Sequence, residues 1–354
     1  MKALIAMSGG VDSSVAALLT QNMGYECIGC TMKLHDIAPA SAADSRTCCS
    51  LDDVEDARSV CYRIGIPYHV FNFKDEFDEK VIRKFIDSYS RGLTPNPCLD
   101  CNRYLKFAKL YERAVVLGCD KIVTGHYARI TEDDGVFHLR KGQDDSKDQS
   151  YVLYNLTQEQ LAHTLFPLGD ISKAEARKIA EENGFVNSHK ADSQDICFVP
   201  DGKYGEFIEK YTGREFQPGD FIGPDGEVLG QHKGIIRYTV GQRKGLGIAY
   251  SEPLFVQRIS PSENRVYLAT DRQIYSRHAE IEDMNIISGE VPASPFRCKV
   301  RIRYKHKEQD AVVTPLGDGR ANILFDEEQR AVTPGQSAVF YDGDIVLGGG
   351  VIVR

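Results

Sequence analysis

The sequence has no hydrophobic run long enough to cross a membrane, because its longest apolar stretches have only the length of a strand. It also lacks an N-terminal segment that combines positive charge, an apolar run and a cleavage site. Ten cysteines in a chain without such a signal indicate free thiols in a reducing compartment, not a disulfide framework. We therefore expect a cytoplasmic protein with no membrane partner.

Two common nucleotide-binding signatures are missing as well. The sequence contains neither GxxxxGK[ST] nor a GxGxxG that opens a helix. Its net charge of −8 argues against indiscriminate nucleic-acid binding and against DNA as a partner, although it permits a local basic patch. The length of 354 residues, with 27% charged and 42% hydrophobic residues, is typical of a soluble protein with two or three domains.

The most informative segment that is present lies near the N-terminus. An apolar stretch at 3–7 leads into Ser-Gly-Gly-Val-Asp-Ser-Ser at 8–14, and a helical pattern follows at once. A glycine turn between a strand and a helix points backbone N–H groups and the positive end of the helix dipole at one spot, which favours a polyphosphate. Gly9 and Gly10 allow the backbone to approach the anion closely. Asp12 beside an anion implies a bridging Mg²⁺.

Strands and helices alternate through the first half of the chain. Strand patterns at 4–7, 27–32, 68–71 and 121–124 are separated by helical ones. This alternation predicts an α/β fold with a doubly wound parallel sheet, whose ligands bind at the carboxyl ends of the strands. The glycine turn, Met32 and Gly125-His126 all fall at such ends.

From about Gly213, short strands separated by Gly, Pro and Asp replace this rhythm. We predict three domains: the doubly wound domain over 1–204, a small central β-rich domain over 205–276, and a C-terminal β-barrel over 277–354.

Three cysteines stand out from the rest. Cys98 and Cys101 follow Pro-Asn-Pro and precede a helical pattern, a position that favours the reactive thiolate and lets two thiols converge. Cys197 lies at the end of a predicted strand or in a loop. The alternative is the usual structural role of a buried cysteine. We assign that role to five others, Cys27, Cys30, Cys61, Cys119 and Cys298.

Together with the glycine turn, several long motifs resemble the bacterial tRNA-specific 2-thiouridylases of the ATP pyrophosphatase superfamily over essentially the whole chain. These motifs are TPNP at 94–97, GHYAR at 125–129, KDQSY at 147–151, DSQDICF at 192–198, TVGQRKGLG at 239–247 and TPGQS at 333–337. The resemblance implies that ATP adenylates the C2 oxygen of the wobble uridine of a tRNA. A sulfur borne by cysteine, supplied by a sulfur-donor protein, then displaces AMP.

The resemblance also implies roles for individual residues. Cys101 corresponds to the attacking cysteine and Cys197 to the cysteine that bears the persulfide. We count Asp12 as a third catalytic residue, because it would help to hold Mg²⁺ at the phosphates. Nucleotide contacts are implied for Ala6, Met7, Ser8, Gly9, Gly10, Val11, Asp12, Ser13, Met32 and Gly125. Contacts to the target base and to the rest of the tRNA are implied for Asn96, Pro97, Cys98, His126, Lys147, Asp148, Gln149, Arg303, Tyr304 and Gln336.

One position departs from the commonest pattern of this family, because Cys98 stands where an aspartate is usual. A Cys-x-x-Cys pair with one distant cysteine suits three-point ligation of a 4Fe–4S cluster, and we favour Cys98, Cys101 and Cys197 as such a metal site. The alternative is a persulfide relay from Cys197 to Cys101, with Cys98 as a spare thiol. A zinc site would normally need a fourth protein ligand, which the sequence does not offer.

A basic stretch and a histidine complete the candidates. If residues 299–307 form one strand, five cations share one face and suit RNA phosphates, although a solvated edge strand is the alternative. For His126 we prefer a substrate contact to a satisfied core histidine. Two other functions remain open: a synthetase of the ATP pyrophosphatase type that acts on a small molecule, and a non-catalytic RNA-binding or iron–sulfur protein.

Overall fold

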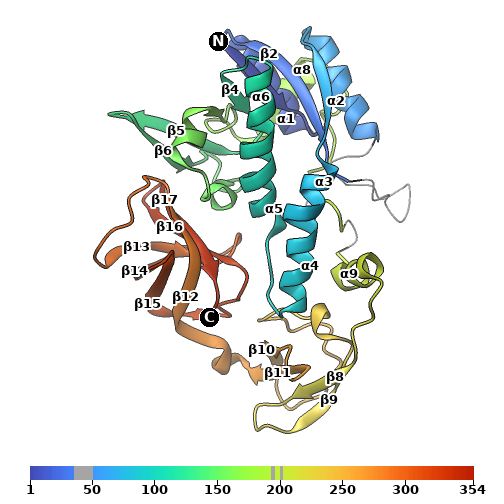
Figure 1. The fold of residues 1–354 in the computed structure, drawn as a ribbon, viewed down its shortest axis with the longest axis vertical. Coiled ribbons are helices and arrows are strands. Elements are labelled where there is room, and N and C mark those ends of the chain that lie inside the picture. The colour runs from blue at the N-terminus through green and yellow to red at the C-terminus, as the bar shows by residue number, and fades with distance from the viewer. Residues whose placement is uncertain (36–50, 193–195, 200–201) are drawn as a thin grey trace.

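The computed structural model describes residues 1–35, 51–192, 196–199 and 202–354, which form three parts (Figure 1). The first part contains a five-stranded parallel sheet with the strand order β3-β2-β1-β4-β7. Its strands are β1 (Lys2–Ala6), β2 (Glu26–Lys33), β3 (Tyr68–Asn72), β4 (Lys121–Val123) and β7 (Thr164–Leu165).

Helices cover both faces of this sheet, so the predicted doubly wound fold is confirmed. Ala3 and Ile5 face one hydrophobic cluster together with residues of α1 (Val11–Asn22), α2 (Leu51–Ile64) and α8 (Lys173–Glu182). Leu4 faces the opposite cluster. Side chains alternate between the faces of a strand, which also puts Cys27 and Cys30 in different clusters, as expected for structural cysteines.

Two long helices cover the Leu4 face and extend toward the rest of the molecule (Figure 1). One runs through α3 (Lys74–Phe77), a π-helical segment (Asp78–Ile82) and α4 (Arg83–Ser90). The other runs through α5 (Pro97–Asp100), a π-helical segment (Cys101–Lys109) and α6 (Leu110–Val116). Cys98 and Cys101 were predicted to precede this second helix, but it begins at Pro97. Cys98 and Cys101 are therefore helical residues and do not lie in a preceding loop.

The central part is a four-stranded mixed sheet with the order β10-β11-β8-β9. Its strands are β8 (Gly219–Ile222), β9 (Val228–His232), β10 (Leu254–Ser260) and β11 (Arg265–Thr270). Helix α9 (Tyr204–Thr212) leads into it. Its buried residues, such as Phe221 and Val256, belong to the same cluster as Leu4, so the first two parts share a continuous core.

The C-terminal part is a closed β-barrel, as predicted, since β12 pairs with both β15 and β17. Its strands are β12 (Tyr275–Ile286), β13 (Phe296–Arg301), β14 (Gln309–Gly317), β15 (Arg320–Arg330), β16 (Ser337–Asp342) and β17 (Ile345–Ile352). A hairpin from the first part, β5 (Ala128–Asp133) with β6 (Val136–Lys141), adds to the barrel sheet through β17. This long-range pairing was not predicted, because no local pattern indicates it.

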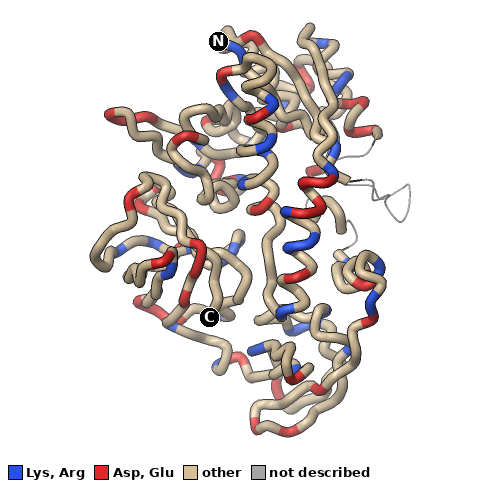
Figure 2. Tube along the Cα trace, viewed as in Figure 1, with Lys and Arg blue, Asp and Glu red and all other residues tan. Residues whose placement is uncertain are grey.

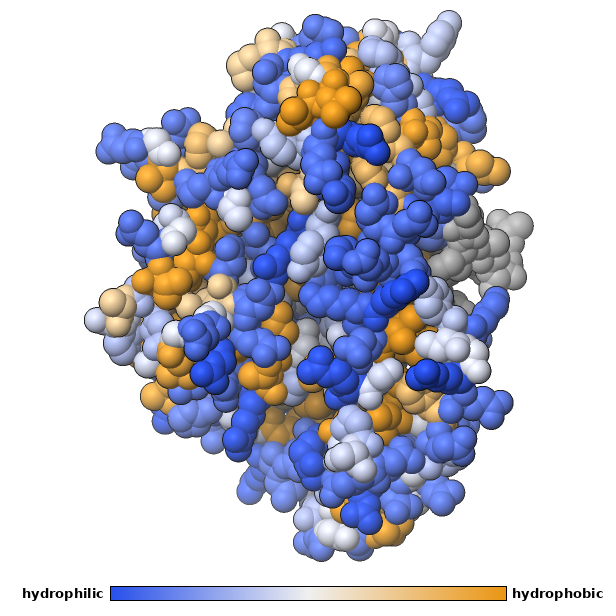
Figure 3. Space-filling model, in the orientation of Figure 1, coloured by the Kyte–Doolittle hydropathy of each residue, from blue (hydrophilic) through white to orange (hydrophobic). Residues whose placement is uncertain are grey.

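Short helical segments complete the chain: Ser150–Leu153, α7 (Gln158–Ala162), Ile235–Arg237 and Asp271–Ile274. A capping box of Ser172 and Glu175 starts α8, and its Ser-x-x-Glu pattern is recognisable in the sequence. Lysine and arginine are interspersed with aspartate and glutamate over all three parts (Figure 2). On the face shown in Figure 3, apolar side chains form small separate patches. None of the described helices has the length and apolar character that a membrane span requires.

Candidate functional site

The glycine turn between β1 and α1 exposes the start of a helix at the carboxyl edge of the sheet. Gly10 is the N-cap residue, and within the described chain no side chain caps this end of α1. The hydroxyls of Ser13 and Ser14 donate to the carbonyl oxygen of Gly10 at 3.0 and 3.1 Å, and Ser13 Oγ accepts from the amide of Ser8 at 3.1 Å. These bonds fix the shape of the turn. The uncapped amides of the first helical turn fit an anionic group.

Two glycines let backbone segments meet at this turn. Gly9 has a φ of +73°, and a Cβ there would lie 2.3 Å from the carbonyl oxygen of Asp53 at the start of α2. A Cβ on Gly125, just after β4, would lie 2.8 Å from Ser13 N and from the carbonyl carbon of Asp12. Gly125 therefore lies directly against the glycine turn, although 112 residues separate it from Ser13 in the chain. This proximity was expected, because both segments follow strands that end at the same edge of the sheet.

Asp12 is not isolated in this structure. Its carboxylate accepts from Lys173 Nζ at 2.7 and 2.8 Å and from the Tyr127 hydroxyl at 2.7 Å. Lys173 is buried at the start of α8, and its ammonium also pairs with Asp192 at 2.7 Å. Burial, and then the adjacent carboxylate of Asp12, raises the pKa of the Tyr127 hydroxyl. A buried lysine shared by two carboxylates therefore stands at the mouth of the turn.

The segment that precedes Cys197 is tied to the same turn by two more side chains. Asn187 is buried and donates through Nδ2 to the carbonyl oxygen of Gly9 and to Ser14 Oγ, both at 2.9 Å. Lys190 Nζ pairs with Asp53 and Asp56 at 2.6 Å each.

Sequence reasoning did not identify Lys173, Tyr127, Asn187 or Lys190. For Lys173, the sequence offers the capping box of Ser172 and Glu175, which indicates that a helix begins there. A capping box does not indicate which residues the first helical side chain contacts.

The first candidate cysteines lie in the opening turns of the helix that begins at Pro97. Asn96 is its N-cap, since its Oδ1 accepts from the amide of Cys98 at 3.1 Å, and Pro97 occupies the favourable first position. Cys98 is exposed, whereas Cys101, three residues on and hence on the same side of the helix, is buried. Cys101 also begins the π-helical segment, a rare conformation that is frequent at functional sites.

Cys197 lies in a turn that is anchored by its neighbour. Phe198 is fully buried and packs edge-on against Phe77 and Phe85 of the first long helix, with ring centroids 5.7 and 5.2 Å apart. The amide of Val199 donates to the carbonyl oxygen of Ile196 at 2.8 Å. Cys197 and Cys101 belong to one hydrophobic cluster, which also contains Ala6 and Met32 at the ends of β1 and β2.

The iron–sulfur cluster predicted for the three cysteines stays a prediction. Over the described ranges, which include Cys98, Cys101 and Cys197, no three His, Cys, Asp or Glu side chains are grouped so that they could hold a metal ion. Asp100, the residue before Cys101, is buried, and its Oδ1 accepts from Lys84 at 2.6 Å. Burial raises the pKa of Asp100, while Lys84 opposes that rise.

The barrel contacts the loop that precedes Cys98. Gln336 Nε2 donates to the carbonyl oxygen of Thr94 at 2.8 Å, and the amide of Thr94 donates to Pro334 at 2.9 Å. The Tyr304 hydroxyl donates to the carbonyl oxygen of Asp148 at 3.1 Å, and burial, followed by the Asp148 carboxylate, raises its pKa. Gln336 and the loop that precedes Cys98, far apart in sequence, are thus in direct contact.

The predicted stripe of five cations is wrong. Strand β13 ends at Arg301, and the chain then turns, so residues 299–307 do not share one face. Arg301 points inward and pairs with Asp148 at 3.1 Å. Arg303 is half-buried and forms no ion pair with another described residue; burial, and then the cation of Arg330, lowers its pKa.

The other residues predicted to contact tRNA have internal partners. His126 is buried between Phe107 and Phe166, and its Nδ1 shares a 2.6 Å hydrogen bond with Thr124 Oγ1, which favours the core role. Buried Asp148 accepts from Gly142 N, Ser150 N and Ser150 Oγ in addition to Arg301. Lys147 pairs with Asp192 at 2.8 Å, and Gln149 Oε1 accepts from the amide of Tyr127 at 2.9 Å.

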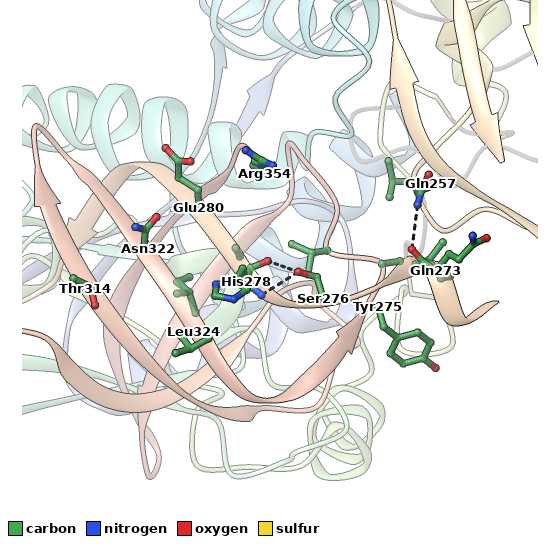
Figure 4. Close-up of a pocket in the computed structure, with 16 residues that line it drawn as sticks. Gln257, Gln273, Tyr275, Ser276, His278, Glu280, Thr314, Asn322, Leu324 and Arg354 are labelled. Atoms are coloured by element: carbon green, nitrogen blue, oxygen red, sulfur yellow. Dashed lines mark hydrogen bonds between the residues drawn. The ribbon is translucent and has the colours of Figure 1, made fainter. Parts of the chain in front are cut away.

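A cavity of about 750 Å³ lies where β12 meets the central part (Figure 4). Its polar lining includes Gln257, Gln273, Tyr275, Ser276, His278, Glu280, Thr314, Asn322 and Arg354. None of the predicted site residues lines this cavity, so it is separate from the candidate site.

Comparison with known proteins agrees with the division of the fold. Residues 1–201 match a family described as the tRNA methyl transferase HUP domain, residues 205–270 its PRC-barrel domain, and residues 276–352 an aminomethyltransferase beta-barrel domain. The parallel sheet with its glycine turn and the three matched ranges identify a tRNA-modifying enzyme of this HUP-domain class.

The relatives are more specific. The chain is 51% identical to a tRNA-specific 2-thiouridylase of Acetivibrio thermocellus, with 99% of each chain covered. It is 48% identical to that of Clostridioides difficile, covering 100% of this chain and 98% of the relative. A 4-thiouridine synthetase–RNA complex with bound ATP is 19% identical over 59% of this chain and 50% of its own, with a TM-score of 0.36, too weak to bear on function. The chain belongs to the tRNA-specific 2-thiouridylase family, and it is an enzyme of the sulfurtransferase type.

Proposed function

We propose that this protein replaces the C2 oxygen of a wobble uridine in tRNA by sulfur, at the expense of ATP. The observations that support this most directly are the uncapped end of α1 at the carboxyl edge of the sheet, and the inclusion of Ala6, Met32, Cys101 and Cys197 in the core that the first two parts share. The family relatives are named for 2-thiolation of tRNA. This function requires an activating nucleotide and sulfur-carrying thiols at one place, and the fold provides positions for both.

ATP would be held by the glycine turn, at residues 6–13, with Met32 and Gly125 on either side. The uncapped amides of α1 would bind the phosphates, and these amides are already oriented by the hydroxyls of Ser13 and Ser14. Mg²⁺, coordinated by the phosphates and by Asp12, would neutralise charge on the leaving pyrophosphate. To bind Mg²⁺, Asp12 would give up part of its contact with Lys173.

The substrate uridine would leave its stack and enter beside Asn96, Pro97 and Cys98. The exposed position of Cys98 and the hydrogen bond from Gln336 to Thr94 in this loop support that placement. Arg303, without an ion-pair partner in the described chain, is the cation best suited to a phosphate of the tRNA. Lys147, Asp148, Gln149 and His126 would act by shaping this surface, because their side chains are engaged internally.

The chemistry balances with two cysteines and without a cluster. The uridine O2 attacks the α-phosphorus of ATP, and pyrophosphate leaves. The Cys101 thiolate takes the terminal sulfur of a Cys197 persulfide, and that sulfur adds to C2 and expels AMP. The Cys197 thiolate then attacks Cys101 Sγ and forms a disulfide with it. The bond between Cys101 Sγ and the transferred sulfur breaks, its electron pair stays on that sulfur, and 2-thiouridine is released. An external thiol reduces the disulfide, and a sulfur-donor protein reloads Cys197.

We also propose domain boundaries near residues 204 and 276. The three sheets and the three matched ranges support them. A cytoplasmic location follows from the need for reduced thiols and a tRNA substrate.

The test is a reconstituted reaction with ATP, a tRNA with an unmodified wobble uridine and a persulfide donor. Nucleoside mass spectrometry should detect 2-thiouridine, and pyrophosphate release should require the tRNA. Cys101→Ser and Cys197→Ser should each retain pyrophosphate release but form no 2-thiouridine.

Cys298→Ala, a change at a half-buried cysteine of the barrel, is the matched control and should behave as wild type. Thiolation by Cys101→Ser would contradict the relay. Pyrophosphate release that occurs without tRNA would instead indicate a synthetase acting on a small molecule.

A further inference from the structure

The two glycine carbonyls of the turn are held by one chain of hydrogen bonds that starts at a buried asparagine. Asn187 Nδ2 donates to the carbonyl oxygen of Gly9 and to Ser14 Oγ, both at 2.9 Å. Ser14 Oγ in turn donates to the carbonyl oxygen of Gly10 at 3.1 Å. The directions of both carbonyl groups are therefore fixed by side chains.

The direction of these carbonyls decides where the next amides point. A peptide group is planar and trans, so its N–H points opposite to its C=O. The carbonyl of Gly9 therefore sets the direction of the Gly10 N–H, and the carbonyl of Gly10 sets that of the Val11 N–H. Across the described ranges, no residue accepts a hydrogen bond from either amide. Both amides are thus available to an anion at the start of α1.

Asn187 occupies a rigid turn, although its own oxygen is not satisfied there. The amide of Lys190 donates to the carbonyl oxygen of Asn187 at 3.0 Å, and Arg177 Nη1 donates to that of Lys190 at 3.1 Å. Asn187 Oδ1 is buried and has no hydrogen-bond partner within the described chain. A buried oxygen without a partner lowers stability. Stability alone therefore does not explain this residue, whereas the two bonds from its Nδ2 give it a role at the turn.

Neither side chain of this hydrogen-bond chain is accessible to a ligand. Asn187 is 2% exposed and Ser14 is fully buried. Any influence of these residues on nucleotide binding must therefore pass through the backbone that they hold. Lys190 supports the same arrangement, since its Nζ also donates to the carbonyl oxygen of Gly9 at 3.3 Å.

We propose that Asn187 and Ser14 are positioning residues, which aim the amides of Gly10 and Val11 at the polyphosphate of ATP. The inference rests on the proposed binding of ATP at this turn. Glycine has more backbone freedom than any other residue. Without the two side chains, the peptide groups of the turn would rotate, and their N–H groups would no longer meet the phosphate oxygens together.

The test measures the affinity of Asn187→Ala for MgATP by calorimetry, and its affinity for tRNA in the absence of nucleotide. The affinity for ATP should fall about tenfold, the loss expected for a misaligned hydrogen bond to a charged group, while the affinity for tRNA stays within about twofold. A general structural defect would weaken the binding of both ligands.

Asn285→Ala is the matched control. Asn285 Nδ2 also donates to two main-chain carbonyl oxygens, those of Tyr154 at 2.7 Å and Leu156 at 3.3 Å, but it lies in the barrel. This variant should lower the melting temperature and leave the affinity for ATP unchanged.

Ser14→Ala is a smaller change, which removes one link of the hydrogen-bond chain and should weaken ATP binding about threefold. Unchanged affinity for ATP in folded Asn187→Ala would overturn the inference. If that variant does not fold, unchanged affinity in Ser14→Ala would overturn it equally. So would parallel losses of ATP and tRNA affinity. Failure of the wild type to bind MgATP would instead refute the proposed function.

Discussion

Asp148→Asn is the substitution that best separates two roles for one residue. Asp148 was expected to contact tRNA, yet its side chain is only 4% exposed and pairs with Arg301, which is 15% exposed. It also accepts from two amides and a hydroxyl. An asparagine preserves the shape but turns an NH₂ group or a neutral oxygen toward the guanidinium, so Arg301 loses the carboxylate that neutralises it.

The size of the effect follows from the remaining contacts of Arg301. Breaking a buried ion pair by removing one partner costs about 3–5 kcal/mol. Arg301 retains hydrogen bonds to the carbonyl oxygens of Tyr304 at 2.7 Å and His306 at 3.0 Å, which places the expected loss near the lower end, about 3 kcal/mol. Because the same arginine positions Tyr304, the affinity for tRNA should fall together with stability.

The assay is urea unfolding followed by circular dichroism, with tRNA affinity measured in parallel. Arg301→Met should also destabilise the protein, and the double variant should lose less than the sum of the two, with a coupling of about 2 kcal/mol. Asp310→Asn is the control, because its pair with Lys299 is exposed and should contribute less than about 1 kcal/mol. If Asp148→Asn weakened tRNA binding while unfolding stayed unchanged, Asp148 would be a direct contact and our reasoning would be refuted.

Three further predictions concern separate parts of the molecule. Gly125→Ala puts a Cβ 2.8 Å from the backbone of α1 and should weaken ATP binding about tenfold. Gly118 has a φ of +66° and open space around its Cβ position, so Gly118→Ala should lower only the stability of the protein. Equal affinities of the two variants for ATP would contradict this prediction. Burial, and then the cations of Arg303 and Arg301, lowers the pKa of His306 to about 4. Since the unfolded chain takes up this proton below about pH 6.5, the free energy of unfolding should fall by roughly 1–3 kcal/mol between pH 6.5 and 4, and His306→Gln should remove that part of the pH dependence. Arg303→Gln should weaken tRNA binding severalfold at unchanged ATP affinity, and unaltered tRNA binding would exclude it as a phosphate contact.

Much of the fold could be predicted because its signals are local. Alternation of apolar residues in the strands, the Ser172–Glu175 capping box and the glycine turn each depend on a few neighbouring residues. The start of the second long helix at Pro97 could not be predicted with the same ease, because a run with two prolines is more typical of a loop, although Asn96 and Pro97 are favourable N-cap and first-turn residues. The cation stripe failed because alternation in sequence was taken as evidence for a strand that ends at Arg301.

The sequence by itself determined the parallel sheet, the position of the glycine turn at its edge, the two β-rich parts and the resemblance that identified the family. Only the tertiary structure decided how the charges are shared. Lys173 lies 161 residues from Asp12, and Arg301 lies 153 residues from Asp148. Backbone conformation follows from short-range sterics and periodicity, whereas an ion pair depends on which surfaces the packed elements bring together. For that reason the residues around the phosphates and thiols could be named from the sequence, while their partners could not.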